Sequence, residues 1–321
     1  MANETLDRKQ ATVGNIYCTL SQTLIQDIRP QLTFLSTFNI FLSITAFLGN
    51  VVILDALRKE SSIRPPSKLF FRCLATTDIC VGVIIGPLVV FHWISIMKDR
   101  WIYCRFLVAI VFVIGSILTQ VSLLTSTAIG VDRLLALLLR LRYNREVTLK
   151  RVYAVLTAFW IISIIFGVMS SINFRAYLWF AYTVITVCLV TALFTYTKIF
   201  RTLRHHQDQT LSAFRQMTPL TLARYRNAVS SALCVQLTMV VCYLPYAVAG
   251  VVSQVLQDPG EPATSSVFLM KVYTVTLVYL NSSLNPILYC WKIASVRDAV
   301  KARVKKVLCR FKFKINSVSY D

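Results

Sequence analysis

An uncharged run from Phe106 to Val131 constrains the fold of this chain more than any other stretch. A helix rises about 1.5 Å per residue, so the run is long enough to cross a hydrocarbon layer about 30 Å thick. Small and polar residues recur within it, although a helix that faces only lipid has no use for them. Such residues let helices approach and bond to one another, so the run predicts a central membrane helix. It ends at Asp132 and Arg133, and charges at the membrane edge are by default functional.

The composition places the whole chain among polytopic membrane proteins. Of its 321 residues, 56% are hydrophobic and 15% are charged, and the mean hydropathy is +0.63. A soluble globule of this size cannot cover so much apolar surface with so few charges. The net charge of +20 comes from basic residues in the loops between apolar runs. No basic module stands clear of these runs, so we expect no nucleic-acid partner.

Seven apolar runs divide the chain, and short polar segments connect them. The loops after the first, third and fifth runs and the C-terminal tail hold 23 basic residues, whereas the alternate connections and the N-terminal tail hold 6. This asymmetry predicts an N-terminus outside the cell and a C-terminus in the cytoplasm, which requires an odd number of spans. We therefore expect an all-α membrane protein, with an extracellular tail over 1–31 and a seven-transmembrane helix bundle over 32–290. The expected spans are 32–57, 69–96, 104–134, 152–171, 177–199, 228–256 and 266–290.

The two tails carry modification signals. Residues 291–321 predict a short amphipathic eighth helix on the inner leaflet and a cytoplasmic tail, because apolar residues recur at helical spacing between lysines and arginines. Cys309 near its end is a candidate for palmitoylation, with an unmodified cysteine as the alternative. In the N-terminal tail, Asn3 begins an Asn-Glu-Thr glycosylation sequon.

Most of the nine cysteines fall inside apolar runs, where a cysteine is usually a small hydrophobic residue. Only Cys18 and Cys104 are expected on the outer side, which makes them a candidate disulfide pair in an oxidising compartment. Two of the three histidines lie in a cytoplasmic loop, and no metal-ligand cluster accompanies His92. We therefore expect no metal centre and no catalytic set.

Polar residues inside the spans are expected to form a cluster around Asp78, a lone carboxylate in the second run. A carboxylate in apolar surroundings is either neutral or paired. Residues 281 and 285 share a helix face because they are four apart. The oxygens of this group suit a hard monovalent or hydrated cation, and a purely structural hydrogen-bond network is the alternative. The expected members are Asp78, Ser122, Asn281, Ser282 and Asn285.

Short motifs occur in order on the seven runs. They are Gly49-Asn50, then Leu74, Ala75 and Asp78, then Asp132-Arg133, Trp160, Tyr196, Cys242-Tyr243-Leu244-Pro245, and Asn285-Pro286-Ile287-Leu288-Tyr289. Through these motifs the chain resembles the rhodopsin-like (class A) G protein-coupled receptors over nearly its whole length. The resemblance implies a plasma-membrane receptor, not an enzyme, that binds an extracellular ligand and activates a heterotrimeric G protein. It also implies that the cluster around Asp78 is a sodium pocket, with no other cofactor.

The resemblance also assigns roles in activation. Arg133, Tyr196 and Tyr289 would rearrange to admit the G protein, and Tyr243 would be the group beneath the ligand that changes rotamer. No acidic residue lies near the start of the sixth run (LARYRNAVS), so we expect Arg133 to pair with Asp132 alone. Our hypothesis is that the inactive state is then less firmly latched and that basal signalling is measurable.

The departures from the family pattern indicate a branch. Leu134 replaces the motif tyrosine, Val108 stands where the third-helix cysteine is usual, and Cys188 stands where the fifth helix usually has a proline. The second outer loop (SSINFRAY) is short and has no cysteine. These features resemble the melanocortin, adenosine, cannabinoid and lysolipid receptors. No ligand signature of that branch is present: Gly115 occupies the amine-binding aspartate position and Gly250 the adenine-binding asparagine position.

The outer half of the predicted bundle offers a mostly apolar lining with a few polar groups, which is typical of ligand sites. Small molecules, lipids and peptides are all candidate ligands. Lys271 favours an anionic or lipid-like ligand, although a boundary lysine that snorkels is the alternative. The candidate ligand-contacting residues are Gly115, Ser116, Thr119, Gln120, Tyr243, Tyr246, Lys271, Val275 and Tyr279.

Other classes of membrane protein fit the sequence less well. An opsin would need a lysine deep in the seventh run, where Tyr279 stands instead. A transporter or channel is the alternative function, but transporters of this size often show repeated halves and broken helices, and the sequence has neither.

Overall fold

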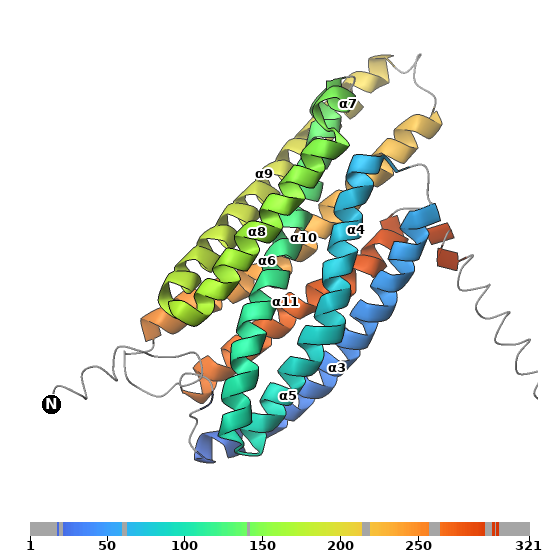
Figure 1. The fold of residues 1–321 in the computed structure, drawn as a ribbon. Helices are drawn as coiled ribbons and strands as arrows, with labels where there is room; N and C mark the ends of the chain where they lie inside the picture. Colours follow the sequence, from blue (N-terminus) through green and yellow to red (C-terminus); the bar gives the residue numbers. More distant parts are fainter. Residues whose placement is uncertain are drawn as a thin grey trace, which may run out of the picture.

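The structure is a computed structural model and describes residue 18 and residues 22–59, 63–139, 142–213, 219–256, 264–292, 297–298 and 300–301. Within 203–213, 219–233 and 254–256 it describes the helical backbone but not the side chains. The described part is a bundle of long helices (Figure 1). They are α3 (Gln22–Lys59), α4 (Pro65–Cys80), α5 (Gly86–Met97), α6 (Trp101–Leu139), α7 (Tyr143–Glu146), α8 (Leu149–Ile172), α9 (Phe174–Ala213), α10 (Pro219–Leu256) and α11 (Ser265–Lys292).

Seven membrane-length helical segments are present within the described residues, which confirms the predicted all-α bundle. They are Leu24–Arg58, Pro65–Met97, Trp101–Leu139, Leu149–Ile172, Phe174–Thr202, Cys234–Ser253 and Ser265–Trp291. The long helices extend beyond several expected spans. In particular, α3 begins ten residues before the expected start of the first span, so residues 22–31 of the expected tail are helical. Asn3, Cys309 and nearly all of the expected eighth helix lie outside the described residues.

The second span is not one regular helix. A π-helical turn, η1 (Val81–Ile85), separates α4 from α5, and Pro87 follows directly in the first turn of α5. Proline lacks a backbone N–H, so a wide turn before it accommodates the missing hydrogen bond. Pro245 and Pro286 lie inside α10 and α11, where each removes one backbone bond in the same way.

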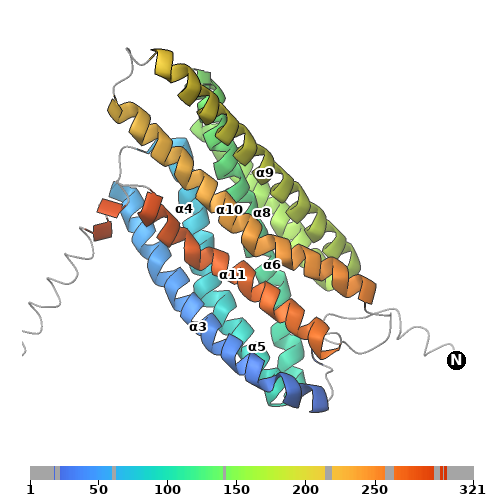
Figure 2. The ribbon, with the colours of Figure 1, turned by 180° about the vertical axis from the view of Figure 1, so that it is seen from behind.

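Apolar side chains form cores at different levels of the bundle. One core joins α3, α5, α6 and α11 around Trp93 and Phe268, and another joins α3, α4, α6, α8, α10 and α11 around Leu74 and Tyr289. A third core joins α6, α9, α10 and α11 around Tyr243. We call the level of the first core the disulfide end and the level of the second the Arg133 end, after residues described below. Viewed from behind, α3, α11 and α10 lie side by side across one face (Figure 2).

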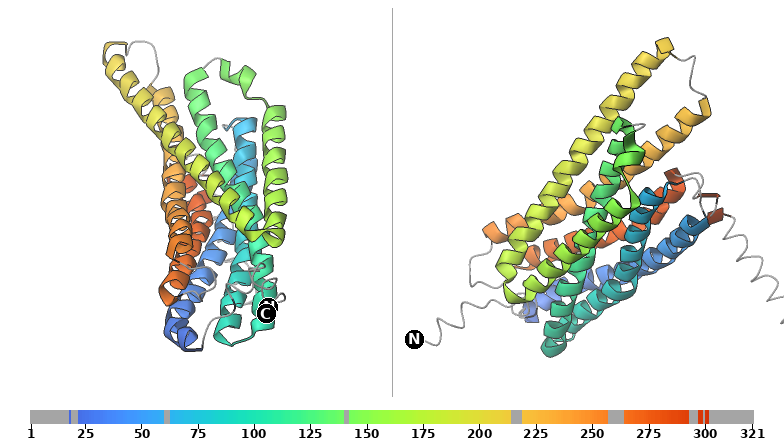
Figure 3. Two further views of the ribbon diagram at one scale, coloured as in Figure 1. Left: turned by 90° about the vertical axis from the view of Figure 1, so that its left-hand side faces the viewer. Right: turned by 45° about the horizontal axis from the view of Figure 1, so that its top comes forward.

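The two ends of α9 (Phe174–Ala213) differ in how they meet the neighbouring helices. At the disulfide end, Asn173 is the only residue between α8 and α9, and its Oδ1 accepts a hydrogen bond from the backbone N–H of Ala176 at 3.1 Å, as an N-cap does. At the other end, α9 and α10 project beyond the neighbouring helices (Figure 3). The first corner is therefore tight, and the projecting pair is the most extended part of the bundle.

Candidate functional site

Asp78 forms the centre of a buried polar cluster between α4, α6 and α11. Its side chain is 0% exposed. Asn285 Nδ2 donates to Oδ2 at 2.8 Å, and the Ser122 hydroxyl donates to Oδ1 at 3.4 Å. Ser282 also interacts with this carboxyl group. Asn281 is buried one turn away on α11, but no described hydrogen bond joins it to Asp78.

Several oxygen atoms around this cluster have no hydrogen-bond partner among the described residues. They include the amide oxygens of Asn50, Asn281 and Asn285. The Asn50 amide nitrogen donates to the backbone of Ser282 at 3.0 Å, which ties α3 to α11. No described salt bridge neutralises Asp78. A buried carboxylate and nearby oxygen atoms that accept no hydrogen bond are the oxygen ligands that a hard cation binds. These residues therefore fit a sodium ion.

Asp132 has three polar partners at the Arg133 end. The Ser67 hydroxyl of α4 donates to Oδ2 at 2.8 Å, and the Tyr143 hydroxyl of α7 donates to Oδ1 at 2.6 Å. Arg133 Nη2 lies 2.9 Å from Oδ2 as an ion pair, without the angle of a hydrogen bond. Burial, together with the hydrogen bond to Asp132, raises the pKa of the Tyr143 hydroxyl above its ordinary value, so it remains a donor.

Phe71 lies between two of the residues expected to act in activation. The Arg133 guanidinium carbon is 5.9 Å from the centre of the Phe71 ring, and the Tyr289 ring meets Phe71 edge-on at 5.2 Å. The Tyr289 hydroxyl is buried and has no described partner. Tyr196 is half-buried and stacks on Phe200 of its own helix at 6.3 Å. No described contact brings Tyr196 to Arg133 or Tyr289.

A further polar contact between helices, which we did not predict, joins α6, α9 and α10. The Gln236 amide of α10 is 1% exposed and bonds twice to the Thr195 hydroxyl of α9, at 2.8 Å from Nε2 and 3.0 Å from Oε1. Gly130 of α6 makes room for it, because a methyl group at that position would overlap the Gln236 amide. A glutamine in an apolar run is the same signal that drew attention to Asp78, so the sequence could have indicated this residue.

Gln120 is a buried polar group at the middle of α6 (Trp101–Leu139). It is 6% exposed, and neither amide atom has a described hydrogen-bond partner. It lies one turn before Leu123, which packs with Ile185 of α9 and Tyr243 of α10. Because residues three apart share a helix face, Gln120 lies between Leu123, which belongs to the core with α9 and α10, and Ile117, which approaches Gly167 of α8. Ser116, one turn further, is buried and bonds to its own helix.

Tyrosines on α9, α10 and α11 form a group of their own. The hydroxyls of Tyr182, Tyr246 and Tyr279 are close enough to interact electrostatically, with Tyr246 as the shared partner. Gly250 of α10 meets the Tyr182 hydroxyl so closely that a side chain on Gly250 would overlap it. The ring from α9 thus fills the space that an asparagine side chain would need.

The other expected ligand-contacting residues lie around this group at two levels. Gly115 is buried on α6 near the Tyr279 hydroxyl, and Thr119 is half-buried one turn along. Lys271 and Val275 are half-buried on α11. Lys271 is two turns from Tyr279, a rise of about 12 Å, so it belongs to a different level from the tyrosines.

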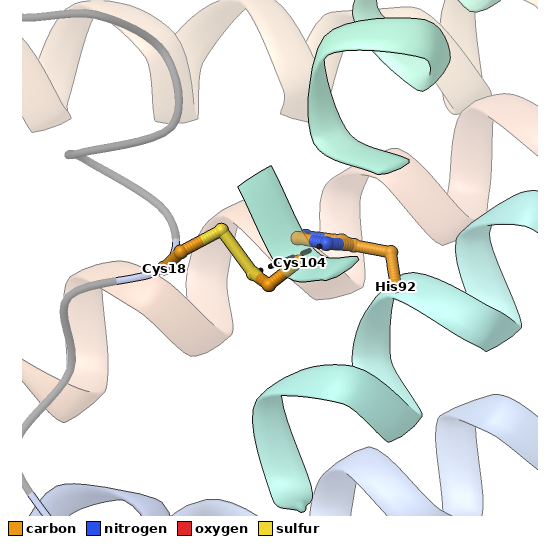
Figure 4. Close-up of side chains that lie close together, drawn as sticks. All are labelled: Cys18, His92 and Cys104. Carbon is orange, nitrogen blue, oxygen red and sulfur yellow. Dashed lines mark hydrogen bonds between the residues drawn. A yellow bond between two sulfur atoms is a disulfide. The ribbon is translucent and has the colours of Figure 1, made fainter. Parts of the chain in front are cut away.

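Cys18 and Cys104 form a disulfide across 86 residues of sequence, with their Cα atoms 5.9 Å apart. Cys104 lies in the first turn of α6, so the bond ties the segment before α3 to that helix. His92 of α5 faces the same bond, with Nδ1 3.6 Å from Cys104 Sγ (Figure 4). These three residues, distant in sequence, place one side-chain atom each within 4.8 Å of one another, and the disulfide joins the two sulfur atoms among them.

Comparison with known proteins returns receptors with seven membrane helices. The family model described as "7 transmembrane receptor (rhodopsin family)" matches residues 49–176 and 169–289. The chain is 25% identical to adenosine receptor A3 of Ovis aries, over 85% of this chain and 90% of that protein. It is 24% identical to adenosine receptor A2b of Gallus gallus, over 84% and 88%. It is 23% identical to a GQ-coupled rhodopsin of Mizuhopecten yessoensis, over 82% and 57%.

Proposed function

Since the chain belongs to the rhodopsin family of seven-transmembrane receptors, which bind ligands in the membrane and signal through G proteins, we propose a specific division of labour within it. The half toward the disulfide end binds a small polar ligand from outside the cell. The Arg133 end opens toward the cytoplasm and engages the G protein. The matching relatives are receptors, which supports this function over a transporter or channel.

The unpartnered amide of Gln120 carries the ligand proposal. A buried donor or acceptor without a partner costs about 1–3 kcal/mol, and Gln120 has one of each. A ligand with an adjacent donor and acceptor, such as a lactam or a nucleobase edge, satisfies both atoms. The tyrosines of α9, α10 and α11 would supply flat apolar surface and further hydroxyls.

This receptor must recognise its ligand differently from receptors in which an asparagine on the sixth helix binds adenine. Gly250 stands at that position, and the Tyr182 hydroxyl fills the space. We infer that Gln120, on the opposite wall, supplies the amide in this chain. Lys271 lies about two turns from Tyr279 on α11, so an anionic group on the ligand would be a secondary feature that extends toward the membrane edge.

The replacement Gln120→Leu tests the ligand site, because leucine has a similar volume and no polar atoms. We expect the ligand-free receptor to melt at the same or a higher temperature, since an unsatisfied amide is removed. We also expect agonists found by screening nucleobases, lactams, lipids and peptides in G-protein reporter cells to lose at least about tenfold in potency. Thr186→Val, at an exposed position on α9 that bonds to its own helix, is the matched control. Agonists with unchanged potency on Gln120→Leu would refute the site.

We also propose that the cluster around Asp78 binds a sodium ion. Asp78, Ser122, Ser282 and Asn285 would hold it, with the unpartnered Asn281 oxygen nearby. The ion would supply the positive charge that the buried carboxylate lacks. Purified receptor should melt at a higher temperature in sodium chloride than in choline chloride of equal ionic strength, because a ligand that binds only the folded state stabilises it. The same difference in Asp78→Asn would exclude this cluster as the site.

Activation is a shift between two packing arrangements of the bundle. In the described arrangement, Asp132 holds α6 to α4 and α7, and Gln236 holds α10 to α9. A ligand that contacts α6, α9 and α10 through the Gln120 face favours any arrangement in which those contacts improve. We propose that the Gln236 amide of α10 then leaves the space beside Gly130. Arg133, Tyr196 and Tyr289 regroup, and the G protein enters.

This scheme requires a plasma-membrane receptor with its N-terminus outside. The excess of basic residues in the loops at the Arg133 end supports that orientation. An epitope tag placed before Asn3 should bind antibody on intact cells, whereas a tag after Asp321 should need permeabilised cells. The reverse result would invert the scheme.

A further inference from the structure

The group formed by Cys18, His92 and Cys104 has a chemistry that receptor signalling does not use. It joins the segment before α3, the helix α5 and the first turn of α6 (Figure 4). Cys104 is 1% exposed and His92 5% exposed, whereas Cys18 is half-buried. The polar contacts described for His92 are all with Cys104, through its sulfur and its backbone.

We propose that reduction of the Cys18–Cys104 disulfide converts this group into a three-ligand zinc site. Two thiolates and one imidazole form the donor set that zinc prefers, with a fourth position open to water. A disulfide sulfur has no charge and binds zinc poorly, so the site exists only in the reduced protein. This inference does not depend on the proposed ligand.

The position of His92 already matches a zinc ligand. With a zinc–sulfur distance of about 2.3 Å and a zinc–nitrogen distance of about 2.0–2.1 Å, tetrahedral geometry separates the two ligand atoms by about 3.6 Å. The Nδ1 of His92 lies 3.6 Å from Cys104 Sγ. Two tetrahedral sulfur ligands lie about 3.8 Å apart, so only Cys18, the more exposed cysteine, has to withdraw once the covalent bond is broken.

The same arrangement favours the reduction step. A small thiol reaches the half-buried Cys18 sulfur and forms a mixed disulfide there, and Cys104 leaves as a thiolate next to the His92 imidazole. A second thiol then releases Cys18, so two thiols become one disulfide and the two cysteines gain two electrons and two protons. Zinc displaces both thiol protons when it binds, and the imidazole binds through its neutral nitrogen.

Zinc binding by the purified full-length receptor before and after reduction tests the proposal. The receptor is reduced with a phosphine, desalted without oxygen, and titrated with zinc against a chromophoric chelator. We expect reduced protein to bind one zinc ion more than oxidised protein. This difference cancels binding at the cysteines that are free in both states, such as Cys188 and Cys242.

Two variants assign the ligands. In His92→Ala the extra zinc should bind at least about tenfold more weakly, a loss comparable to that for disturbing a metal's supporting residues. The control His205→Ala should behave as wild type. In addition, cobalt in the reduced wild-type protein should give a thiolate charge-transfer absorption that is absent after oxidation. Equal zinc binding by oxidised and reduced protein, or full affinity in His92→Ala, would overturn the proposal.

Discussion

The two ends of the bundle hold their polar groups in different ways. At the Arg133 end, polar side chains on different helices bond to one another, as Asp132 does with Ser67 and Tyr143. At the disulfide end, Asn39 of α3 donates a hydrogen bond to Thr276 of α11, and a covalent bond between Cys18 and Cys104 is added to such contacts.

The two kinds of bond differ in whether they can be exchanged during a change between two arrangements of the bundle. A hydrogen bond contributes about 0.5–1.5 kcal/mol net, so several can be exchanged for others at small net cost, which a two-state change requires. A covalent bond does not exchange in this way. The disulfide end is thus fixed by a bond that does not exchange, and the Arg133 end is closed by hydrogen bonds that can be exchanged.

The largest expected effect on stability comes from removing the covalent bond. In the chain-entropy account, a bond that closes a loop of this length stabilises the folded state by about 4–5 kcal/mol, and the membrane already restricts the unfolded helices, so we expect about 2–4 kcal/mol. The double variant Cys18→Ser/Cys104→Ser should melt at a lower temperature, measured by thermal unfolding of purified receptor. Cys80→Ser, at a free half-buried cysteine, is the control. If both variants melt alike, the bond does not hold this end.

The next effect, a loss of stability of about 1–3 kcal/mol, is expected from filling the space beside Gly130 that the Gln236 amide occupies. The methyl group of Gly130→Ala would displace the Gln236 amide and break its bonds to Thr195, and overpacking costs this much. We expect a lower melting temperature and higher second-messenger levels without ligand, relative to wild type at equal surface expression.

The double variant Gly130→Ala/Gln236→Ala provides the internal control. In Gln236→Ala the side chain no longer reaches Gly130, so the two changes should be non-additive. The loss of stability in the double variant should be smaller than the sum of the losses in the two single variants. Additive losses would mean that Gly130 and the Gln236 amide are independent.

A smaller effect, about 1–2 kcal/mol, is expected from Tyr143→Phe, which removes one hydrogen bond to the Asp132 carboxylate. Ligand-free signalling should rise modestly because α6 loses its tie to α7. Tyr153→Phe, at an exposed position on α8, should match wild type in both assays. No change in Tyr143→Phe would assign the closure of this end to Ser67 and Gln236 instead.

The contribution of Tyr143 should also depend on pH in one direction only. Its pKa is raised in the folded protein, so the unfolded chain loses this proton first, near the ordinary value of about 10. The stability difference between wild type and Tyr143→Phe should therefore be constant at neutral pH and shrink as the pH rises above about 10. A difference that grows with pH would mean that the tyrosine binds as its anion.

The seven spans and their order could be predicted because apolar length and basic loops report the membrane directly. The placement of Asp78 near Asn285 followed from the expectation that polar residues inside spans gather in the bundle interior, and the structure adds how their atoms meet. Gln236 was overlooked although it carries the same signal, a strongly polar group in an apolar run. Tyr143 could not be found in this way, because a four-residue helix in a loop has no periodicity to read.

The group around His92 shows the limit of reading sequence spacing. Its three members lie 12 to 86 residues apart along the chain, and only the arrangement of α5, α6 and the segment before α3 brings them together. A metal-ligand search by spacing therefore misses them, whereas coordinates reveal them at once.

The one-residue corner at Asn173 has a mechanical consequence. Consecutive Cα atoms are about 3.8 Å apart, so the joined ends of α8 and α9 cannot separate and any motion of α9 relative to α8 has to pivot there. Its 40 residues make an arm about 60 Å long. A tilt of only about 5° at that pivot would carry the far tip sideways by about 5 Å, roughly half the width of a helix.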